Sequence, residues 1–385
     1  MLGTMRLSDC HNFHDFRRLA QCRLPGPIFN YIDGGADDEV THRRNTESFE
    51  RCDLVPNILR GVAALDTSVT VLGQKLAVPF YCSPTALQRL FHHEGERAVA
   101  AAAARHGTMF GVSTVGTVSL EELRKAHNTP QIYQFYFHKD RGLNRAMIQR
   151  AKEAGVEVMM LTVDSITGGN RERDLRTGFS IPLRLTLGAV LQFAIKPMWA
   201  LNHFTHESFK LPQLDAHIDM SGDALSVGRY LTEMLDPTMN WNDVAEMVEF
   251  WNGKFCLKGV MSVSDARRAA EIGCAGIVLS NHGGRQLDGS RAPFDQLAEI
   301  VDLVGDRIDV LIDGGIQRGT HVLKALSLGA KAVGIGRYYL YALAAAGRAG
   351  VERALGLLRA EIERDMRLMG CTSLSQLNRD NLRFR

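Results

Sequence analysis

Eight short apolar runs recur along the chain, and all but the fourth are followed directly by a stretch with the periodicity of an amphipathic helix. Such runs are typical of buried parallel strands, and the stretches that follow are typical of helices packed on them. We predict strands at 78–82, 109–113, 131–135, 158–163, 255–257, 276–279, 309–312 and 332–335. We predict helices at 94–105, 120–126, 141–154, 265–272, 294–304, 321–328 and 339–369.

Eight units in series predict an α/β fold of the closed (β/α)8 barrel type. A doubly wound sheet usually has about five or six parallel strands, and no G-x-G-x-x-G motif opens the first unit. The 385 residues fit a barrel with additions, since barrels take roughly 250 residues and can exceed 400. We expect an N-terminal helical cap (1–70), the first half of the barrel (71–164), an insertion after the fourth strand (165–240), and the second half with a C-terminal helix (241–385).

Composition excludes several classes of protein. The formal net charge of +2 argues against nucleic-acid binding, because there is no basic excess to neutralise phosphates. The seven cysteines are odd in number, scattered and without a C-x-x-C pair, which favours reduced thiols over disulfides or a zinc site. No signal peptide is visible, so a cytoplasmic location is expected.

The insertion has an unusual charge pattern. Between Asp174 and Glu207 it contains no acidic residue, and its bases are Arg176, Arg184 and Lys196. The apolar stretch 185–195 is too short to cross a bilayer, which needs about 20 apolar residues. With the aromatic residues Trp199 and Phe204, this composition suits peripheral contact of 175–210 with an anionic membrane. A lid that packs its apolar face on the barrel is the alternative.

Polar or glycine residues follow nearly every predicted strand, at the barrel end that carries catalysis in this fold. The segments are Ser83-Pro84-Thr85-Ala86, Ser113-Thr114, Gln134-Phe135-Tyr136, Thr162-Val163-Asp164, Lys258-Gly259, Ser280 to Arg285, Asp313-Gly314-Gly315 and Gly336-Arg337. Any one of them can be structural, and Gly314-Gly315 alone suggests only a tight turn. The glycines and Arg337 after strands seven and eight together match the usual phosphate site of the barrel.

His282 is the strongest acid/base candidate, because histidine titrates nearest to neutral pH. Asp164 can hydrogen-bond and orient it, and Arg171 offers the planar fork that a carboxylate favours. Lys258 closes an apolar strand, so it predicts a fixed positive charge beside an electron-rich ring or an anion. Further donors to a carboxylate or hydroxyl are Tyr31 and Tyr136.

At this point the sequence resembles a known family. The segment Ser280-Asn281-His282-Gly283-Gly284-Arg285-Gln286-Leu287-Asp288 is similar to the signature of the FMN-dependent L-2-hydroxy acid oxidases and dehydrogenases. This family includes glycolate oxidase, L-lactate dehydrogenase and mandelate dehydrogenase. The likeness covers nearly the whole chain, at 31–36, 84–86, 133–136, 162–164, 171–174, 258–259, 313–315 and 336–337.

The resemblance implies a role for each of these residues. The catalytic residues would be His282 as the base, Asp164 assisting it, and Lys258 stabilising negative charge on the flavin. The substrate carboxylate would be bound by Arg171 and Arg285, with hydrogen bonds from Tyr31 and Tyr136. FMN would be held by Pro84, Thr85, Ala86, Ser113, Gln134, Thr162, Lys258, Ser280, Asp313, Gly314, Gly315, Gly336 and Arg337.

Three departures from the family pattern bear on ligand binding. Gln317 stands where the family often has an arginine that contacts the phosphate, although Arg318 and Arg337 remain nearby. Val115 stands where glycolate oxidases have a tryptophan, and 165–169 lacks the usual proline. These changes predict rearranged phosphate contacts and a roomier pocket, which favours L-lactate or a bulkier acid such as L-mandelate over glycolate.

The electron acceptor follows from the insertion. It resembles the membrane-facing segment of bacterial mandelate and lactate dehydrogenases, which implies a quinone or cytochrome acceptor at the inner face of the cell membrane. Relatives are commonly homotetramers, so a homo-oligomer is expected. An oxidase that uses oxygen and produces hydrogen peroxide is the competing hypothesis within the family.

Two more hypotheses lie outside this chemistry. A nucleotide oxidoreductase on the same barrel needs a loop cysteine, whereas Cys256 and Cys274 are predicted in a strand and a helix. A non-catalytic flavin-binding protein would be expected to lack His282 or Arg285, and both are present.

Overall fold

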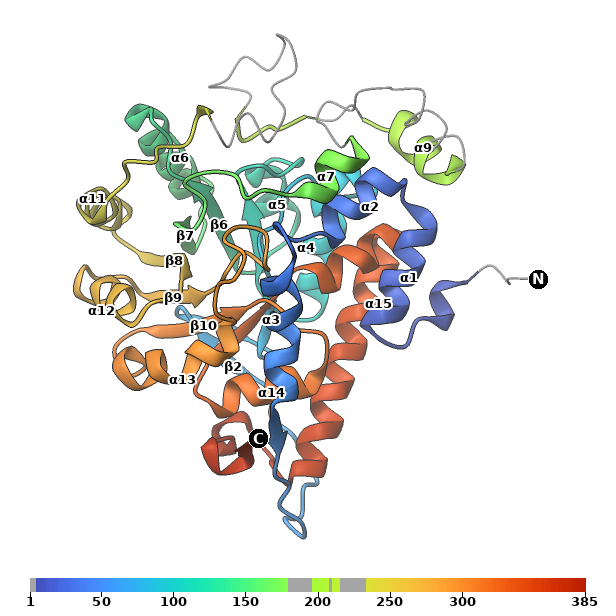
Figure 1. The fold of residues 1–385 in the computed structure, drawn as a ribbon, viewed down its shortest axis with the longest axis vertical. Coiled ribbons are helices and arrows are strands. Elements are labelled where there is room, and N and C mark those ends of the chain that lie inside the picture. The colour runs from blue at the N-terminus through green and yellow to red at the C-terminus, as the bar shows by residue number, and fades with distance from the viewer. Residues whose placement is uncertain (1–4, 179–195, 208–209, 215–232) are drawn as a thin grey trace.

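The computed structural model describes residues 5–178, 196–207, 210–214 and 233–385. Eight parallel strands close a barrel, with β11 pairing to β4 to complete the ring (Figure 1). The strands are β4 (Phe80–Cys82), β5 (Phe110–Ser113), β6 (Gln131–Tyr136), β7 (Val158–Thr162), β8 (Lys254–Val260), β9 (Gly276–Leu279), β10 (Asp309–Asp313) and β11 (Ala332–Ile335). The predicted (β/α)8 barrel is therefore confirmed.

Helices surround the barrel between successive strands. They are α4 (Glu96–Arg105), α5 (Leu120–Ala126), α6 (Arg141–Glu153), α11 (Trp241–Trp251), α12 (Val263–Glu271), α13 (Pro293–Val304), α14 (Gly319–Ser327) and α15 (Arg337–Met369). Helix α11 has no counterpart among the predicted helices. The prediction of one helix at 339–369 is also wrong in part, because α15 breaks at Ala346 and Gly347, where Gly347 adopts a φ of +55°.

A hairpin of β2 (Val69–Val71) and β3 (Gln74–Leu76) closes the N-terminal end of the barrel, where the sequence predicted no strand. In the turn between β2 and β3, the backbone N–H of Leu72 donates to the Asp309 carboxylate at 2.6 Å. Leu72 and Leu76 belong to the barrel's inner core, with Tyr81, Met109, Ile132, Val158, Met160, Cys256, Val278, Leu311 and Ala332. The barrel interior is thus packed below the polar strand ends.

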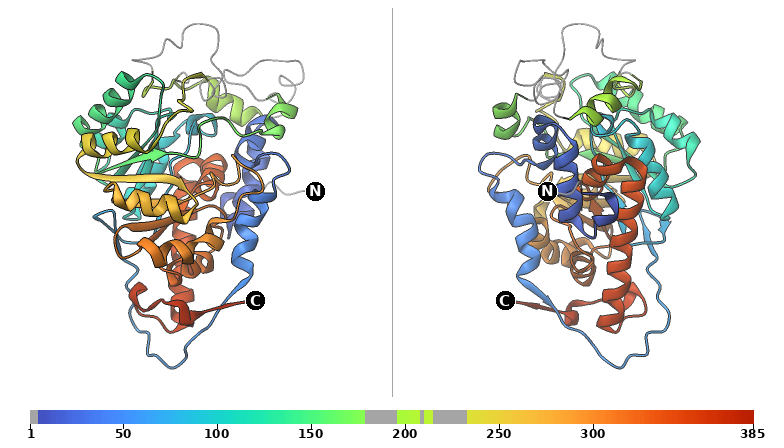
Figure 2. Two further views of the ribbon diagram at one scale, coloured as in Figure 1. Left: turned by 60° about the vertical axis from the view of Figure 1, so that its left-hand side comes forward. Right: turned by 90° about the vertical axis from the view of Figure 1, so that its right-hand side faces the viewer.

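The N-terminal segment forms helices α1 (Phe13–Arg23), α2 (Gly26–Asp33) and α3 (Val40–Glu50), after the short 3-10 helix η1 (Leu7–Asp9). Asn12 caps α1 by accepting hydrogen bonds from the first-turn amides of His14 and Asp15. Helix α1 runs along α15 (Figure 2). The C-terminal strand β12 (Leu382–Phe384) pairs with β1 (Cys52–Leu54), which follows α3. The remaining short helices are η2 (Gln88–Leu90), η3 (Leu374–Gln376) and η4 (Arg379–Asn381).

Two helices of the insertion are described, α7 (Glu172–Thr177) and α9 (Pro197–Phe204). The predicted apolar stretch 185–195 and Arg184 lie outside the described residues. The interpretation of Trp199 as an interface aromatic is wrong: it is 5% exposed and its indole donates to the Leu90 carbonyl at 2.8 Å. Phe204, in contrast, is 69% exposed. Among the described helices, none is long and apolar enough to cross a membrane.

Candidate active site

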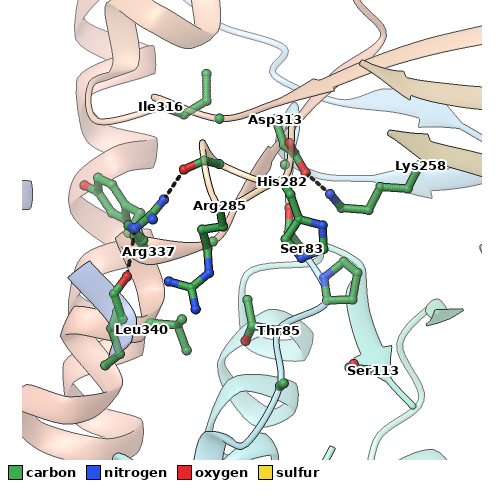
Figure 3. Close-up of a pocket in the computed structure, with 18 of the residues that line it drawn as sticks. Ser83, Thr85, Ser113, Lys258, His282, Arg285, Asp313, Ile316, Arg337 and Leu340 are labelled. Atoms are coloured by element: carbon green, nitrogen blue, oxygen red, sulfur yellow. Dashed lines mark hydrogen bonds and ion pairs between the residues drawn. The ribbon is translucent and has the colours of Figure 1, made fainter. Parts of the chain in front are cut away.

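A cavity opens at the carboxyl ends of the strands, between the barrel, the N-terminal helices and the segment before α7 (Figure 3). Seventeen of the predicted site residues line it: Tyr31, Pro84, Thr85, Ala86, Ser113, Gln134, Tyr136, Thr162, Arg171, Lys258, His282, Arg285, Asp313, Gly314, Gly315, Gly336 and Arg337. Two others, Asp164 and Ser280, lie behind the wall and contact residues that line it. The structure thus brings together side chains that are more than 300 positions apart in the sequence.

His282 follows β9 with a φ of +57°, in the left-handed region that non-glycine residues rarely adopt. Its Nδ1 lies 2.9 Å from Asp164 Oδ1 and 3.2 Å from the hydroxyl of Ser165. Ser165 also donates to Asp164 Oδ1 at 2.9 Å. Because Nδ1 is engaged, Nε2 is the ring nitrogen available to a ligand.

Burial keeps the His282 imidazole neutral near pH 7. Burial lowers the pKa of His282, and Asp164 restores only part of that shift. Burial opposes ionisation of Asp164 too, but His282, Lys258 and Ser165 together hold the pKa of Asp164 below its ordinary value. A neutral imidazole beside a carboxylate can accept a proton on Nε2 near neutral pH.

Gly259 makes room for this pair. It follows Lys258 in β8 with a φ of +105°, and a Cβ there would lie 2.6 Å from the Cβ of Asp164. A side chain at this position would push Asp164 away from His282, so the close approach requires glycine.

Lys258 forms a buried charge cluster on one side of the cavity. Its Nζ donates to Ser280 Oγ at 2.7 Å and pairs with Asp313 Oδ2 at 2.9 Å (Figure 3). Burial would lower the pKa of Lys258, but Asp313 and Asp164 raise it overall, so the ammonium stays charged. The second oxygen of Asp313, Oδ1, is buried without a hydrogen-bond partner among the described residues, which leaves an acceptor for a ligand hydroxyl.

A row of hydrogen bonds crosses three neighbouring strands. Ser113 Oγ donates to Gln134 Oε1 at 2.9 Å, and Gln134 Nε2 donates to Thr162 Oγ1 at 2.9 Å. The row fixes the orientation of the Gln134 amide at the cavity wall.

Two arginines and two tyrosines share one part of the cavity. The guanidinium of Arg285 lies 4.8 Å from the centre of the Tyr31 ring and donates to the Tyr31 carbonyl at 2.6 Å. Burial and the nearby Arg171 lower the pKa of Arg285 to about 9. The Nε of Arg171 has no hydrogen-bond partner among the described residues, and burial raises the pKa of the Tyr136 phenol, which therefore remains a donor. Neighbouring cations with free donors favour an anionic ligand.

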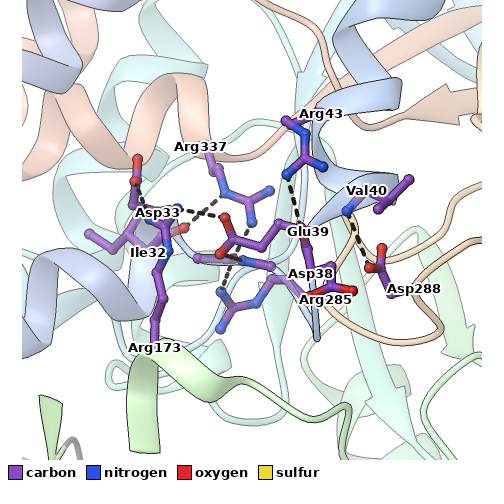
Figure 4. A network of polar contacts seen from close by, with 12 residues as sticks. Ile32, Asp33, Asp38, Glu39, Val40, Arg43, Arg173, Arg285, Asp288 and Arg337 are labelled. Carbon is purple, nitrogen blue, oxygen red and sulfur yellow. Dashed lines mark hydrogen bonds and ion pairs between the residues drawn. The ribbon is translucent and has the colours of Figure 1, made fainter. Parts of the chain in front are cut away.

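Arg337 lies on the opposite side of the cavity from Lys258 (Figure 3). Its guanidinium donates to the carbonyls of Ile32, Gly34 and Gly283 at 2.7–2.9 Å (Figure 4). Three of its five N–H groups are thereby used, and one on each terminal nitrogen remains. Arg318, which the sequence placed nearby, pairs with Glu361 at 2.9 Å and is not among the residues that line the cavity.

Several lining residues were missed by sequence reasoning, among them His42, Thr46 and Phe91. His42 and Thr46 lie one turn apart on α3, and Phe91 stacks on Tyr31 with ring centres 6.3 Å apart. Helix α3 reaches this position because Gly315, with a φ of +77°, has no Cβ; one there would lie 2.1 Å from the Asn45 carbonyl. A polar face of α3 at i and i+4 was the available signal.

The hypothesis of a cysteine enzyme finds no support in the site. Cys256 is buried in β8, as predicted. Cys274 is not in a helix but in the turn between α12 and β9, at the end of the barrel opposite the cavity, so that prediction is wrong. The described residues contain no group of three or more histidine, cysteine or acidic side chains arranged to hold a metal ion.

Known proteins share this architecture. The sequence pattern of the FMN-dependent dehydrogenases matches residues 20–384. An L-lactate oxidase of Nostoc sp. is 39% identical, covering 97% of this chain and 98% of its own. An L-lactate dehydrogenase of Pectobacterium atrosepticum is 39% identical, covering 96% and 95%. The crystal structure of a monotopic membrane protein, (S)-mandelate dehydrogenase, superposes with a TM-score of 0.93 at 34% identity, covering 98% of this chain and all of the other.

Proposed function

The chain belongs to the FMN-dependent dehydrogenase family, and from this premise we propose that it oxidises L-lactate or a bulkier L-2-hydroxy acid and delivers the electrons to a membrane acceptor. It is an FMN-dependent L-2-hydroxy acid dehydrogenase or oxidase that forms the 2-oxo acid. One observation carries the assignment of roles: the His282–Asp164 pair and the Arg171–Arg285 pair face the same cavity.

The cavity fits FMN. The unpartnered Asp313 Oδ1 suits a ribityl hydroxyl, and the row of Ser113, Gln134 and Thr162 suits the polar edge of a flavin. Gly314 and Gly315 follow β10, and Gly336 follows β11 at the N-terminus of α15, where a phosphate is favoured. We propose that these residues hold FMN, with Lys258 beside the ring and Arg337 near the phosphate. When bound, FMN supplies the two-electron acceptor.

The side chains of the chain perform the remaining steps. Arg171 and Arg285 would bind the substrate carboxylate, with Tyr31 and Tyr136 donating hydrogen bonds. His282 would then accept a proton from the substrate on Nε2, and Asp164 would stabilise the resulting imidazolium. Lys258 would keep a fixed positive charge where negative charge accumulates. Ser280 would hold Lys258 in place, rather than contact the cofactor directly.

Small side chains set the substrate size. Ala86 and Val115 line the cavity, and Val115 is buried. Phe91 adds an aromatic surface next to Tyr31. This combination favours a substrate that carries a methyl or aryl group on carbon 2 over glycolate, which carries only hydrogen there.

The acceptor is proposed from the surface of α9. Its large apolar side chains Met198, Leu201 and Phe204 are 55%, 57% and 69% exposed, while Trp199 faces the barrel. An exposed apolar helix face of this kind suits the membrane interface. We propose peripheral attachment to the inner face of the cell membrane, a quinone or cytochrome as the acceptor, and a homo-oligomeric assembly.

An oxidase is the second candidate, because the Nostoc relative at 39% identity is an L-lactate oxidase. Turnover of L-lactate is to be followed with a soluble quinone analogue and, separately, in air with an oxygen electrode. The proposal predicts faster turnover with the quinone and little hydrogen peroxide. One peroxide per 2-oxo acid at comparable speed would establish the oxidase instead.

A further inference from the structure

One wall of the cavity contains residues to which the function proposed above gives no role. His42 and Thr46 of α3 line it, together with Gln317 and Arg337. Thr46 Oγ1 accepts a hydrogen bond from Gln317 Nε2 at 3.1 Å and donates one to the Gly315 carbonyl at 3.3 Å. These contacts fix α3 against the glycine loop after β10, and they hold His42 one turn away at the same end of the cavity.

The surroundings of His42 are strongly positive. The charged groups that face it are Arg337 of α15, Arg173 of α7, Arg285 after β9 and Asp33 of α2. Asp33 is already paired with Arg17 at 2.6 Å and with Arg173 at 2.9 Å, so it leaves little negative charge for the imidazole. The His42 ring has no hydrogen-bond partner among the described residues, although it is half-buried.

The backbone of α3 at His42 packs closely against two glycines, Gly284 and Gly35. A Cβ on Gly284 would lie 2.5 Å from the His42 backbone nitrogen, and a Cβ on Gly35 would lie 3.0 Å from its Cβ. Gln317 is neutral and Arg318 is engaged by Glu361, so Arg337 is the arginine that lines the cavity beside the glycine loop after β10 in the described part of the chain. A protonated His42 would add a positive charge next to it.

We propose that His42 is a ligand of the FMN phosphate and that it takes up a proton from solvent when FMN binds. The inference rests on the proposed binding of FMN in this cavity. No covalent bond changes in the ligand: the imidazole becomes an imidazolium that donates a hydrogen bond to a phosphate oxygen.

Electrostatics gives the direction of this coupling. Without a ligand, Arg337 and burial lower the pKa of His42 to about 3, so the ring is neutral at pH 7. A phosphate dianion between Arg337 and His42 reverses the local charge and raises the pKa of His42 in the complex. Because binding raises the pKa of His42, FMN binds most tightly at a pH below the pKa of His42 in the complex. FMN affinity therefore falls as the pH rises above that pKa.

Calorimetry of the flavin-free protein with FMN tests the proposal. Titrations at pH 7 in HEPES and in Tris, which differ in ionisation enthalpy, give the number of protons bound. We expect about one proton taken up per FMN in the natural protein and close to none in His42→Gln. The variant should bind FMN about tenfold more weakly, as expected for a lost charge-assisted hydrogen bond.

Riboflavin, which lacks the phosphate, separates this inference from the proposed function. It should bind without proton uptake and equally well to the natural protein and to His42→Gln, which also shows that the variant is folded. His106→Gln is the matched control, since His106 is half-buried but does not line the cavity. Unchanged proton uptake and FMN affinity in His42→Gln would overturn the role of His42 alone. Failure of both flavins to bind the natural protein would overturn the proposed function as well.

A measurement without variants gives an independent test. Between pH 7 and 9 the FMN phosphate is already a dianion, because its second pKa is about 6. The dissociation constant of FMN should rise over this range while that of riboflavin stays constant. A dissociation constant of FMN that does not change with pH would contradict the proposal.

Discussion

Asp164 lies 2.9 Å from His282 Nδ1 and stabilises its protonated form, which offsets part of the effect of burial on the pKa of His282. Activity requires neutral His282, so kcat/KM should fall as the pH drops through its pKa, which lies below the ordinary value of 6.5. Asp164→Asn removes the charge that stabilises the imidazolium. This acid limb should therefore move to lower pH, and kcat should fall by about 100-fold or more. Steady-state rates from pH 4 to 8 check both effects.

Ser165→Ala is the control for that variant. It removes a hydrogen bond to Asp164 but keeps the carboxylate, so kcat should fall by less than about tenfold. If Asp164→Asn kept both the rate and the acid limb of the natural protein, Asp164 would have no role in proton transfer.

Arg171 is expected to bind the carboxylate of the substrate. Its Nε at the cavity wall has no hydrogen-bond partner within the described part of the chain, which indicates a place for one substrate oxygen. Arg171→Lys keeps the charge but loses the fork, so KM for L-lactate should rise by about 10- to 100-fold with the FMN content unchanged. Arg176→Lys, on the exposed side of α7, should leave KM unchanged. Equal KM values for all three proteins would remove Arg171 from the substrate site.

The site residues differed in how well the sequence predicted them. His282, Lys258 and Asp313 end strands of a repeating fold, so their position along the strand places them at the barrel mouth. His42 and Thr46 are brought there only by packing of α3 on a distant loop, since Thr46 and Gly315 are 269 residues apart. The polar residues at i and i+4 indicate a polar face of α3, but they do not indicate which distant loop that face contacts.

Helix α9 is the element that we expect to contact the membrane. Replacing Met198, Leu201 and Phe204 by serine removes its exposed apolar face, and Trp199 should keep the helix docked. The variant should no longer float with vesicles of phosphatidylcholine and phosphatidylglycerol, while flavin binding persists. Serine at Ile58 and Leu59, exposed 77% and 96% far from α9, is the matched control and should still float. Equal flotation of both variants would contradict a membrane role for α9.

The β2–β3 hairpin supplies the stability prediction. Leu76 is fully buried in the inner core, so Leu76→Ala should destabilise the protein by about 2–5 kcal/mol. Denaturant unfolding measures this, with exposed Lys75→Ala as a control that should change little. If Leu76→Ala lowered the free energy of unfolding as little as Lys75→Ala does, the hairpin would not close the barrel.

Element prediction succeeded where burial leaves a trace in the sequence. Parallel strands buried on both faces are apolar runs, and these were recognised throughout the barrel. The hairpin strands are only three residues each, shorter than the runs that identify strands. The sequence did not predict the break in α15, because Ala344, Ala345 and Ala346 favour helix. The helix is interrupted at Gly347, where the backbone packs closely against His92 and Glu94.

At the scale of the whole molecule, the site lies where three parts of the chain meet. Asp33 of the N-terminal helices joins Arg17 to Arg173, and Arg173 also bonds Glu39 at 2.5 Å (Figure 4). Segments before β4 and after β7 are thereby fastened over the same end of the barrel. Helix α9 lies near α2 and α7 at that end (Figure 1), so with the proposed membrane attachment both substrate and acceptor would approach from the side that faces the membrane.

The central claim is oxidation of an L-2-hydroxy acid at FMN, and anaerobic reduction of the bound flavin tests it most directly. The purified protein is mixed without oxygen with L-lactate, L-mandelate and glycolate in turn, and with the D-forms of the first two, while the visible flavin absorbance is recorded. We predict bleaching by L-lactate or L-mandelate, faster than by glycolate, and none by the D-forms. A yellow protein that none of these acids bleaches would contradict the account.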